Sequence, residues 1–452
     1  AANNVAVGHE ALTANTTGAD NVAVGSGSLG ANTEGTSNTA LGKAAMGANT
    51  TGNANVAIGA ISGDAITTGI DNTAVGTGTL STATTANYNV AIGRDALRLN
   101  TSGTRNTAVG TFAMDSVTTA NDNTGLGYVA GASLTDGHSN TLVGSEAGDS
   151  ITTGDENTAL GHGALDGGTT VNGNTAVGTD AMGGALTGSY NTAVGYNALL
   201  VATGVTGTTA IGNQVLDALT TGDNNTGVGG GALGANTTGA SNVAVGHIAL
   251  DSCTSGGNNV GIGRASGDGV TTGHSNTLLG YNSGVTLTTG DSNICIGLDS
   301  AVSEAGAQNQ IVLGNALTAP GAGSFAFGRT SVGRVYNSFG SNASWTRDSD
   351  ERLKTDIQDA TLGLNFINNL KTKTFKWKPN NELPETLDAY QEENVKDTSI
   401  VMHGMIAQEV KAALDTEGVD TFGGWAESSD GCQSISQEMF VHPLIKAVQE
   451  LS

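Results

Sequence analysis

Near residue 349 the sequence brings together the residue types that nucleophilic catalysis needs. The segment Ser-Asp-Glu-Arg-Leu-Lys begins at Ser349 and ends at Lys354, five residues further on. A serine hydroxyl becomes a nucleophile when a base takes its proton, and a lysine can be that base if burial lowers its pKa from about 10.4 towards 7. On a helix this spacing separates the side chains by nearly one and a half turns, so the pair needs a bend or a neighbouring chain.

The same segment also has a structural interpretation. Ser349 could cap a helix that starts at Asp350, because a serine side chain accepts from backbone N–H groups at a helix N-terminus. Acidic residues also favour the first turn of a helix. Taken alone, the local sequence favours the cap over the nucleophile.

Other candidate sites are weaker, and we predict no metal and no cofactor. Acidic turns such as Asp155–Glu156 and 223–225 could bind calcium, but they lack the nine-residue Gly-rich calcium repeat. The three cysteines are scattered and fit no disulfide framework, so we predict buried free thiols; they are Cys253, Cys295 and Cys432. Seven histidines show no ligand spacing; they are His9, His138, His162, His247, His274, His403 and His442.

Composition excludes most ordinary protein classes. The 452 residues include 69 Gly but only 4 Pro, and 13 % are charged, about half the usual charged share. Residues 1–340 hold 7 Lys/Arg against 22 Asp/Glu, a charge of −15, and residues 341–452 hold 10 against 19, a charge of −9. Neither part has a basic stripe or an apolar run near ~18 residues, so we predict no nucleic-acid partner and no membrane insertion.

The strongest pattern is a repeat. The pentapeptide Asn-Thr/Val-Ala-Val-Gly recurs every 17 residues from Asn4 to Gln310, nineteen times without an insertion. Its fourth residue is always aliphatic, and its fifth is always glycine, from Gly8 to Gly314. β-Branched alternation predicts a short strand. The glycine predicts the end of that strand, by positive φ or by close approach of another backbone.

The second half of each repeat carries another apolar residue. The ninth position is Leu or Met in twelve repeats and Gly in five. In those five repeats the twelfth position is aliphatic, which indicates one core pocket filled from either of two positions. The pairs are Gly63–Ile66, Gly131–Leu134, Gly148–Ile151, Gly267–Val270 and Gly284–Leu287.

Seventeen residues are too few for a helical solenoid repeat but fit one coil of a parallel β-roll, with two short strands and two turns. The first-position asparagines would stack as a ladder, each amide bonding the next. One coil offers its core only one small residue and two aliphatics. We therefore expect a homotrimer of thin rods, with the small third-position residues where the chains approach one another.

The repeat Asn-Thr-Ala-Val-Gly…Ala-Leu…Asn-Thr-Thr-Gly resembles the head repeats of trimeric autotransporter adhesins, and equally the repeats of phage and algal-virus fibres. The resemblance covers residues 4–328. It implies a left-handed parallel β-roll that trimerises. It does not name a ligand.

Composition changes near residue 325, where aromatic residues gather. Lysine occurs once before residue 341, at Lys43, and eight times after it. We predict, in order, a helix over 364–370, a strand over 372–378, a polar loop over 379–398, a helix over 401–414 and a terminal helix over 443–451.

Four segments of this region resemble the intramolecular chaperone of endosialidases and other phage tail fibres, the self-cleaving serine peptidase type. They are Ser-Asp-x-Arg-Leu-Lys, Phe-Lys-Trp, Ile-Ala-Gln-Glu-Val and Leu-Ile-Lys-Ala-Val-Gln-Glu-Leu, in the family's order over 104 residues. The resemblance implies that the domain trimerises the fibre and then cuts itself off. By carry-over Ser349 is the nucleophile, Lys354 its base, and Asp348–Ser349 the scissile bond. Trimer assembly could bury Lys354 and so switch cleavage on.

We therefore expect a mostly β chain with a β-roll over 1–330, a junction over 331–348 and a small α+β chaperone domain with a terminal helix over 349–452. The expected function is a virion tail fibre, or adhesive fibre, that attaches to a glycan or surface-protein receptor of a host. Its only catalysis would be a single autocleavage. Because the chain opens inside a repeat, we expect more chain before residue 1.

A bacterial cell-surface trimeric adhesin, which is extracellular rather than part of a virion, is the alternative. Ice binding is disfavoured because Thr holds only one strand position and is often Val. A polysaccharide-degrading spike is disfavoured because the aromatic residues before residue 320 lie in different repeats. These are Tyr88, Phe112, Tyr128, Tyr190, Tyr196 and Tyr281.

Overall fold

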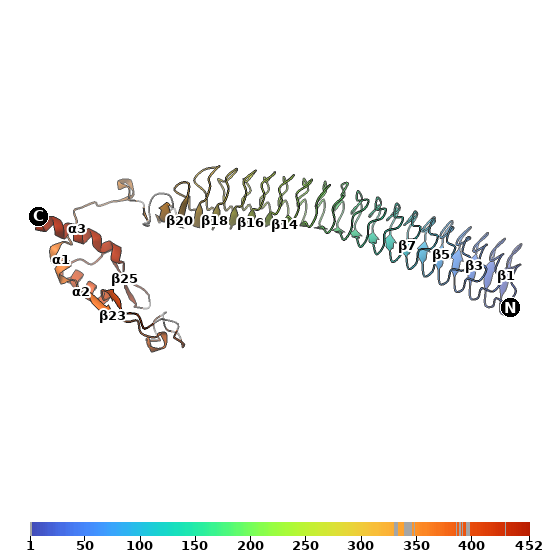
Figure 1. Cartoon of the computed structure of the whole chain (residues 1–452), viewed down its shortest axis with the longest axis horizontal. Helices are drawn as coiled ribbons and strands as arrows, with labels where there is room; N and C mark the ends of the chain where they lie inside the picture. Colours follow the sequence, from blue (N-terminus) through green and yellow to red (C-terminus); the bar gives the residue numbers. More distant parts are fainter. Residues whose placement is uncertain are drawn as a thin grey trace. The chain divides into compact units, whose positions relative to one another are not determined.

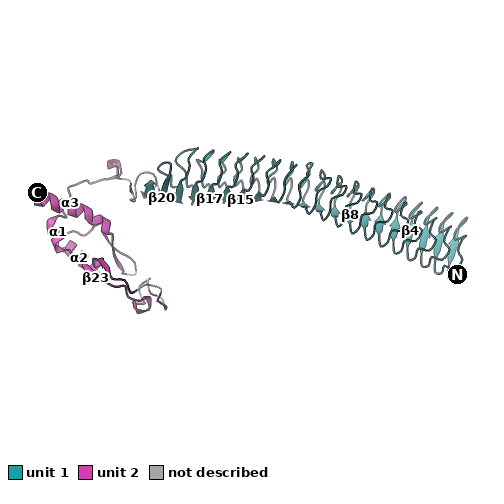
Figure 2. Ribbon diagram, in the orientation of Figure 1, with its two compact units in different colours: residues 1–348 teal, residues 349–452 magenta. Residues whose placement is uncertain are grey.

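Each repeat closes into one coil of a parallel β-solenoid (Figure 1). The computed structural model describes residues 2–329, 333–338, 346–347, 349–385, 387, 390, 392–394, 398–429 and 431–452. The chain forms two units, unit 1 over Ala1–Asp348 and unit 2 over Ser349–Ser452 (Figure 2). The predicted fold class is confirmed: a mostly β chain with a solenoid of 17-residue coils and a small domain with a terminal helix.

One strand per coil builds the sheet of unit 1. Each of the first eighteen strands spans three residues and pairs in parallel with the strand one repeat later, so that Val5 lies beside Val22. These strands are β1 (Val5–Val7), β2 (Val22–Val24), β3 (Thr39–Leu41), β4 (Val56–Ile58), β5 (Thr73–Val75), β6 (Val90–Ile92), β7 (Thr107–Val109), β8 (Thr124–Leu126), β9 (Thr141–Val143), β10 (Thr158–Leu160), β11 (Thr175–Val177), β12 (Thr192–Val194), β13 (Thr209–Ile211), β14 (Thr226–Val228), β15 (Val243–Val245), β16 (Val260–Ile262), β17 (Thr277–Leu279) and β18 (Ile294–Ile296).

The sheet ends in four further strands, and the last two of them pair antiparallel. β19 (Ile311–Asn315) and β20 (Ser324–Arg329) continue the parallel pairing, whereas β21 (Gly333–Ser338) and β22 (Thr346–Arg347) pair antiparallel.

The expectation of two strands per coil is wrong. The seventh and ninth positions of the repeat take a positive φ, +58° at Asp95 and +49° at Leu97. Such residues leave the extended region of φ/ψ space, so the backbone turns where a second strand was expected. The turns still deliver side chains to the core, because Ala96 and Leu97 are fully buried.

The expectation that the small third-position residues lie where the chains approach one another is also wrong. In β2 to β18 only the middle residue of the three faces the interior of its own coil; Ala40, for example, is fully buried. The aliphatic fourth residue faces outward instead, and Leu41 is 46 % exposed. Successive residues of a strand point to opposite faces of the sheet. One chain therefore encloses its core and displays a row of aliphatic side chains.

The predicted asparagine ladder is confirmed. The buried Asn55 amide donates to Asn38 Oδ1 at 3.2 Å and to the Gly69 carbonyl at 2.8 Å. The backbone N–H of Asn55 also donates to Asn38 Oδ1, at 3.0 Å. Because an unsatisfied buried polar group costs about 1–3 kcal/mol, this ladder lets each coil bury an amide without that penalty.

The fifth-position glycines are required for both predicted reasons. Gly76 has φ +135°, and a Cβ added there would lie 2.7 Å from the carbonyl oxygen of Gly93 in the next coil. The ninth-position glycines make room for neighbours. A Cβ at Gly148 would lie 2.7 Å from Leu142 Cδ2 and 3.0 Å from Ile151 Cδ1. The shared pocket thus also accommodates a large third-position residue, Leu142.

In the described part of unit 2 there are three α-helices and two antiparallel pairs of strands. The helices are α1 (Leu364–Asn369), α2 (Ala407–Thr416) and α3 (Val441–Leu451); the strand pairs are β23 (Lys373–Phe375) with β24 (Met402–Gly404) and β25 (Trp425–Glu427) with β26 (Gln433–Ile435). The 3₁₀ turns are η1 (Glu351–Leu353), η2 (Asn380–Glu382) and η3 (Gln437–Phe440). The predicted helix over 401–414 is thus wrong at its start, because residues 402–404 pair with β23.

The core of unit 2 is small. Its buried members are Leu362, Phe366, Val410, Ala413, Leu414 and Phe440. The ring of Phe366 stacks on that of Phe440, with centroids 6.2 Å apart. Helix α3 lies beside α1, and Glu450 Oε2 accepts from the backbone N–H of Leu364 at 2.7 Å.

Candidate active site

The segment from Ser349 to Thr361 begins unit 2, and each of its residues is exposed. The turn η1 interrupts it. Asp350 is the N-cap of this turn, because its side chain accepts from the backbone N–H of Arg352 at 2.9 Å. The turn closes when the backbone N–H of Lys354 donates to the Glu351 carbonyl at 3.0 Å.

This turn brings the predicted pair into contact. Lys354 Nζ donates to Ser349 Oγ at 2.7 Å. Lys354 itself is extended, with φ −125° and ψ 148°, so its side chain reaches back past the turn. The bend that the spacing of five required is therefore present within one chain. The helix-cap interpretation of Ser349 is wrong, because the capping residue is Asp350.

An ion pair spans the same turn. Arg352 Nε donates to Asp350 Oδ1 at 2.9 Å and Arg352 Nη2 donates to Asp350 Oδ2 at 2.7 Å. The hydrogen bond from Arg352 lowers the pKa of the Asp350 carboxyl, and the same contact raises the pKa of the guanidinium. Sequence analysis did not single out this pair, although an Asp and an Arg two residues apart beside a capping position were a visible signal.

The contact between Lys354 and Ser349 supports general-base catalysis only when Ser349 Oγ is the donor and Lys354 Nζ the acceptor. While the lysine is protonated, its ammonium donates to the serine and the hydroxyl is not activated. A neutral amine would accept the Oγ proton instead. Burial is the usual way to favour a neutral lysine, and in one chain both Ser349 and Lys354 are exposed. Asp348, the other side of the predicted scissile bond, lies outside the described residues.

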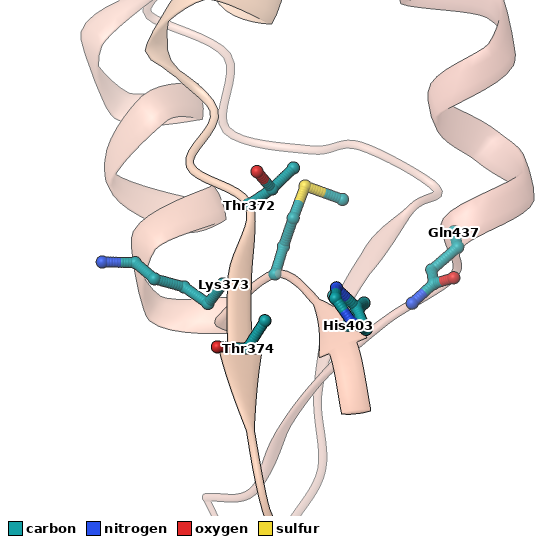
Figure 3. Close-up of a pocket in the computed structure, with 7 residues that line it drawn as sticks. Thr372, Lys373, Thr374, His403 and Gln437 are labelled. Atoms are coloured by element: carbon teal, nitrogen blue, oxygen red, sulfur yellow. The ribbon is translucent and has the colours of Figure 1, made fainter. Parts of the chain in front are cut away.

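Sequence analysis also missed a cavity in unit 2. It has a volume of about 740 Å³ and lies between the β23–β24 hairpin and η3. Figure 3 shows His403 and Gln437 facing Thr372 and Thr374 across it, while Lys373 points away. Lys373 Nζ instead pairs with Glu409 Oε1 at 3.2 Å.

The other candidates in unit 1 are used to connect coils. Asp155 Oδ1 accepts from the backbone N–H of His138 at 2.6 Å, and Asp223 Oδ1 accepts from that of Thr206 at 2.8 Å. His138 Nδ1 accepts from the backbone N–H of Asn121 at 3.0 Å. Across the described part of the chain, no cluster of three or more His, Cys, Asp or Glu residues could hold a metal ion.

The prediction of buried thiols is right for two of the three cysteines. Burial raises the pKa of Cys253 to about 11 and that of Cys295 to about 12. Cys432 is exposed, so the prediction is wrong there. It belongs to unit 2, whose small core leaves much of the chain at the surface.

Together, the fold and this pair define a class: a β-solenoid rod followed by a small domain that begins with a Ser–Lys contact. Residues 349–419 match the model of a family described as the chaperone of endosialidase. The match includes Ser349 and Lys354 and begins where unit 2 begins. No curated protein matches the chain. Among the described residues, no helix is long and apolar enough to cross a membrane.

Proposed function

We propose that the chain is part of a virion tail fibre whose C-terminal domain assembles it as a homotrimer and then cuts itself off. The observation that carries this proposal is the position of the Ser–Lys pair. The boundary between the units falls between Asp348 and Ser349, at the bond that the pair would cut. Cleavage there releases unit 2 whole and leaves every coil of unit 1 intact.

The chemistry balances as an acyl shift followed by hydrolysis. Lys354 takes the proton of Ser349 Oγ, and the oxygen attacks the carbonyl carbon of Asp348. The C–N bond to Ser349 breaks, and the proton passes to the leaving nitrogen, which gives an ester and a free amine. One water then hydrolyses the ester. The products are residues 1–348 with a carboxylate end and residues 349–452 with an amino end.

Two apolar surfaces support assembly from identical chains. In unit 1 the fourth-position aliphatics form one row along the sheet, which we call the stripe; its most exposed members are Val7, Leu41, Ile58, Ile92, Leu126, Leu160, Ile211, Ile262, Leu279 and Ile296. A contiguous row of exposed apolar side chains marks an interaction surface. Every coil contributes one residue, so an identical rod is the matching partner.

The second surface lies on helix α3. Pro443 and Ala447 are buried. The exposed side of the helix carries Val441, Leu444, Ile445, Val448 and Leu451, each at least 50 % exposed. Apolar residues at spacings of three and four form the seam of a coiled coil. Assembly through α3 is how we propose that unit 2 fixes the number of chains and buries Lys354.

The rod would then face outward as the part of the fibre that meets a host receptor, a glycan or a surface protein. A bacterial surface adhesin would share the rod, but the match of residues 349–419 favours the tail fibre.

Intact mass of the purified chain, followed over days at pH 7 and pH 9, tests the cleavage. We expect products of residues 1–348 and 349–452, faster at pH 9, and no products from Ser349→Ala or Lys354→Ala. Matched controls are Ser434→Ala and Lys371→Ala, exposed residues elsewhere in unit 2. A wild-type chain that stays at full mass under all conditions overturns the peptidase proposal.

A further inference from the structure

We infer that Asp350 and Arg352 are positioning residues for the cleavage, because their ion pair holds the turn that brings Lys354 to Ser349. This inference rests on the proposed self-cleavage and adds to it two residues that the chemistry does not touch.

An exposed lysine has many rotamers, and its ordering costs up to about 2 kcal/mol. Ser349 and Lys354 are both exposed, so packing in one chain does not hold them together. The contact of 2.7 Å between Nζ and Oγ depends instead on the path of the backbone between them.

That path is a single 3₁₀ turn, three residues long. The hydrogen bonds of a 3₁₀ turn have poorer geometry than those of an α-helix, and none of the residues of this turn is buried. Two interactions of Asp350 stabilise it. One carboxylate oxygen accepts from the backbone N–H of Arg352 at 2.9 Å, and the two oxygens together accept from the guanidinium at 2.9 and 2.7 Å.

The guanidinium is suited to this task because its planar fork matches both oxygens of one carboxylate. It therefore fixes the side chain of Asp350 in the orientation that also caps the turn. Neither residue contacts Ser349 Oγ or Lys354 Nζ in the described hydrogen bonds. Lys354 also lowers the pKa of the Asp350 carboxyl electrostatically. The contribution that we infer is geometric, because misplacement of a catalytic group by about 1 Å can cost roughly 10²-fold in rate.

The test is the single-turnover cleavage rate of the full chain, with the trimer measured in parallel. Asp350→Ala should slow cleavage by roughly 10²-fold, and Arg352→Gln should slow it by about tenfold. The double variant should be no slower than Asp350→Ala, because both changes remove one contact. Arg352→Lys should rescue little, because an ammonium lacks the fork. All four variants should trimerise as the wild type does.

The matched control is Arg105→Gln. Arg105 makes the same two-pronged contact with Asp122 on the surface of unit 1, so its loss should leave the cleavage rate unchanged. The pH profile separates positioning from electrostatics. Asp350→Asn with Arg352→Gln keeps the net charge, so the plateau rate should fall while the midpoint stays in place.

A midpoint that moves in this double variant would overturn positioning and assign the pair an electrostatic role. Wild-type rates for Asp350→Ala and Arg352→Gln would overturn the inference and leave the self-cleavage proposal intact, because Ser349→Ala would still be inactive. A wild-type chain that never cleaves would overturn both.

Discussion

The two units of this chain bury their residues in different ways. Unit 1 repeats one set of local contacts, so that each coil makes its hydrogen bonds and its core packing with the two adjacent coils. The core of unit 1 is therefore closed within one chain. Unit 2 builds a small core from segments far apart in the sequence, such as Phe366 and Phe440. Much of its aliphatic surface remains exposed, on α3 and in the segment that holds Ser349.

This difference indicates that unit 1 determines the shape of the rod, whereas unit 2 determines how the chains assemble. Every coil of unit 1 displays the same kind of residue on the stripe, so a partner rod displaced by one coil would lose the contacts of only one coil. Such a surface favours association but specifies register weakly, as flat repetitive strands do. Unit 2 has no internal repeat, and we infer that the number and register of the chains are set there.

The largest expected effect comes from removing unit 2. A chain of residues 1–348 should form coils with normal β circular dichroism but should associate without a defined register, giving aggregates or a broad distribution in analytical ultracentrifugation. The matched sample is the Ser349→Ala chain, which keeps unit 2 attached. If residues 1–348 alone sediment as a single trimer, unit 2 does not carry the assembly information.

A charge on the stripe should weaken assembly while sparing the coil. Leu126→Asp with Leu160→Asp places two carboxylates on side chains that are 45 % and 48 % exposed in one chain. The single chain should tolerate both, but burial of unpaired charges between rods is costly, so the trimer should dissociate at a higher protein concentration than the wild-type trimer does. Thr153→Asp is the control, because that position is exposed and the previous repeat naturally carries Asp136 there. Equal sedimentation of the two variants would rule out the stripe as an interface.

A smaller effect is expected from a cavity in the core of unit 1. Leu97 is fully buried, so Leu97→Ala should cost about 2–5 kcal/mol per chain. The damage should stay near that coil, because coils contact only their neighbours. Hydrogen exchange would reveal faster exchange around residue 97 and unchanged exchange ten coils away. Leu298→Ala, at a side chain 42 % exposed, should cost under about 0.5 kcal/mol. Uniform loss of protection along the rod would contradict the local account.

The smallest effect concerns the shared pocket. Gly148→Leu should cost about 1–3 kcal/mol through overpacking, since the new side chain meets Leu142 and Ile151. The positive φ of +60° at Gly148 adds backbone strain for a leucine, but Leu97 takes +49° at the equivalent position, so a coil accommodates a leucine in this conformation. Leu142→Ala should restore most of the lost stability and Ile151→Asn part of it. If neither second change restores stability in a denaturant titration, volume exchange does not explain these glycines.

The fold of unit 1 could be predicted because its signal is repeated nineteen times. The comparison of successive repeats gives the period, the position of the strand, the role of the fifth-position glycine and the asparagine ladder. The sequence did not reveal which strand residue faces inward. Ala and Val are both apolar, and only the path of the coil shows that Ala40 is inside and Leu41 outside. The sequence did not reveal the turn that replaces the expected second strand either, because Leu at a positive φ, as at Leu97, is uncommon.

The candidate site was predicted in part. Residue types and the family resemblance located Ser349 and Lys354, and the structure brings them into contact. The turn that does so depends on the hydrogen bonds of Asp350. The capping role therefore belongs to Asp350, whereas the sequence suggested Ser349 for it. The cavity beside His403 was missed because its lining comes from three separated segments, and no local pattern marks such a convergence.

Native mass spectrometry of the freshly folded wild-type chain, sampled over time, decides whether trimerisation precedes cleavage, because it reports chain number and chain length together. We expect that an intact trimer appears first and then loses its 104-residue C-terminal fragments, leaving a trimer of residues 1–348. Monomers that carry the cut before any trimer forms would contradict the proposed order. A chain that remains an intact monomer would contradict the account as a whole.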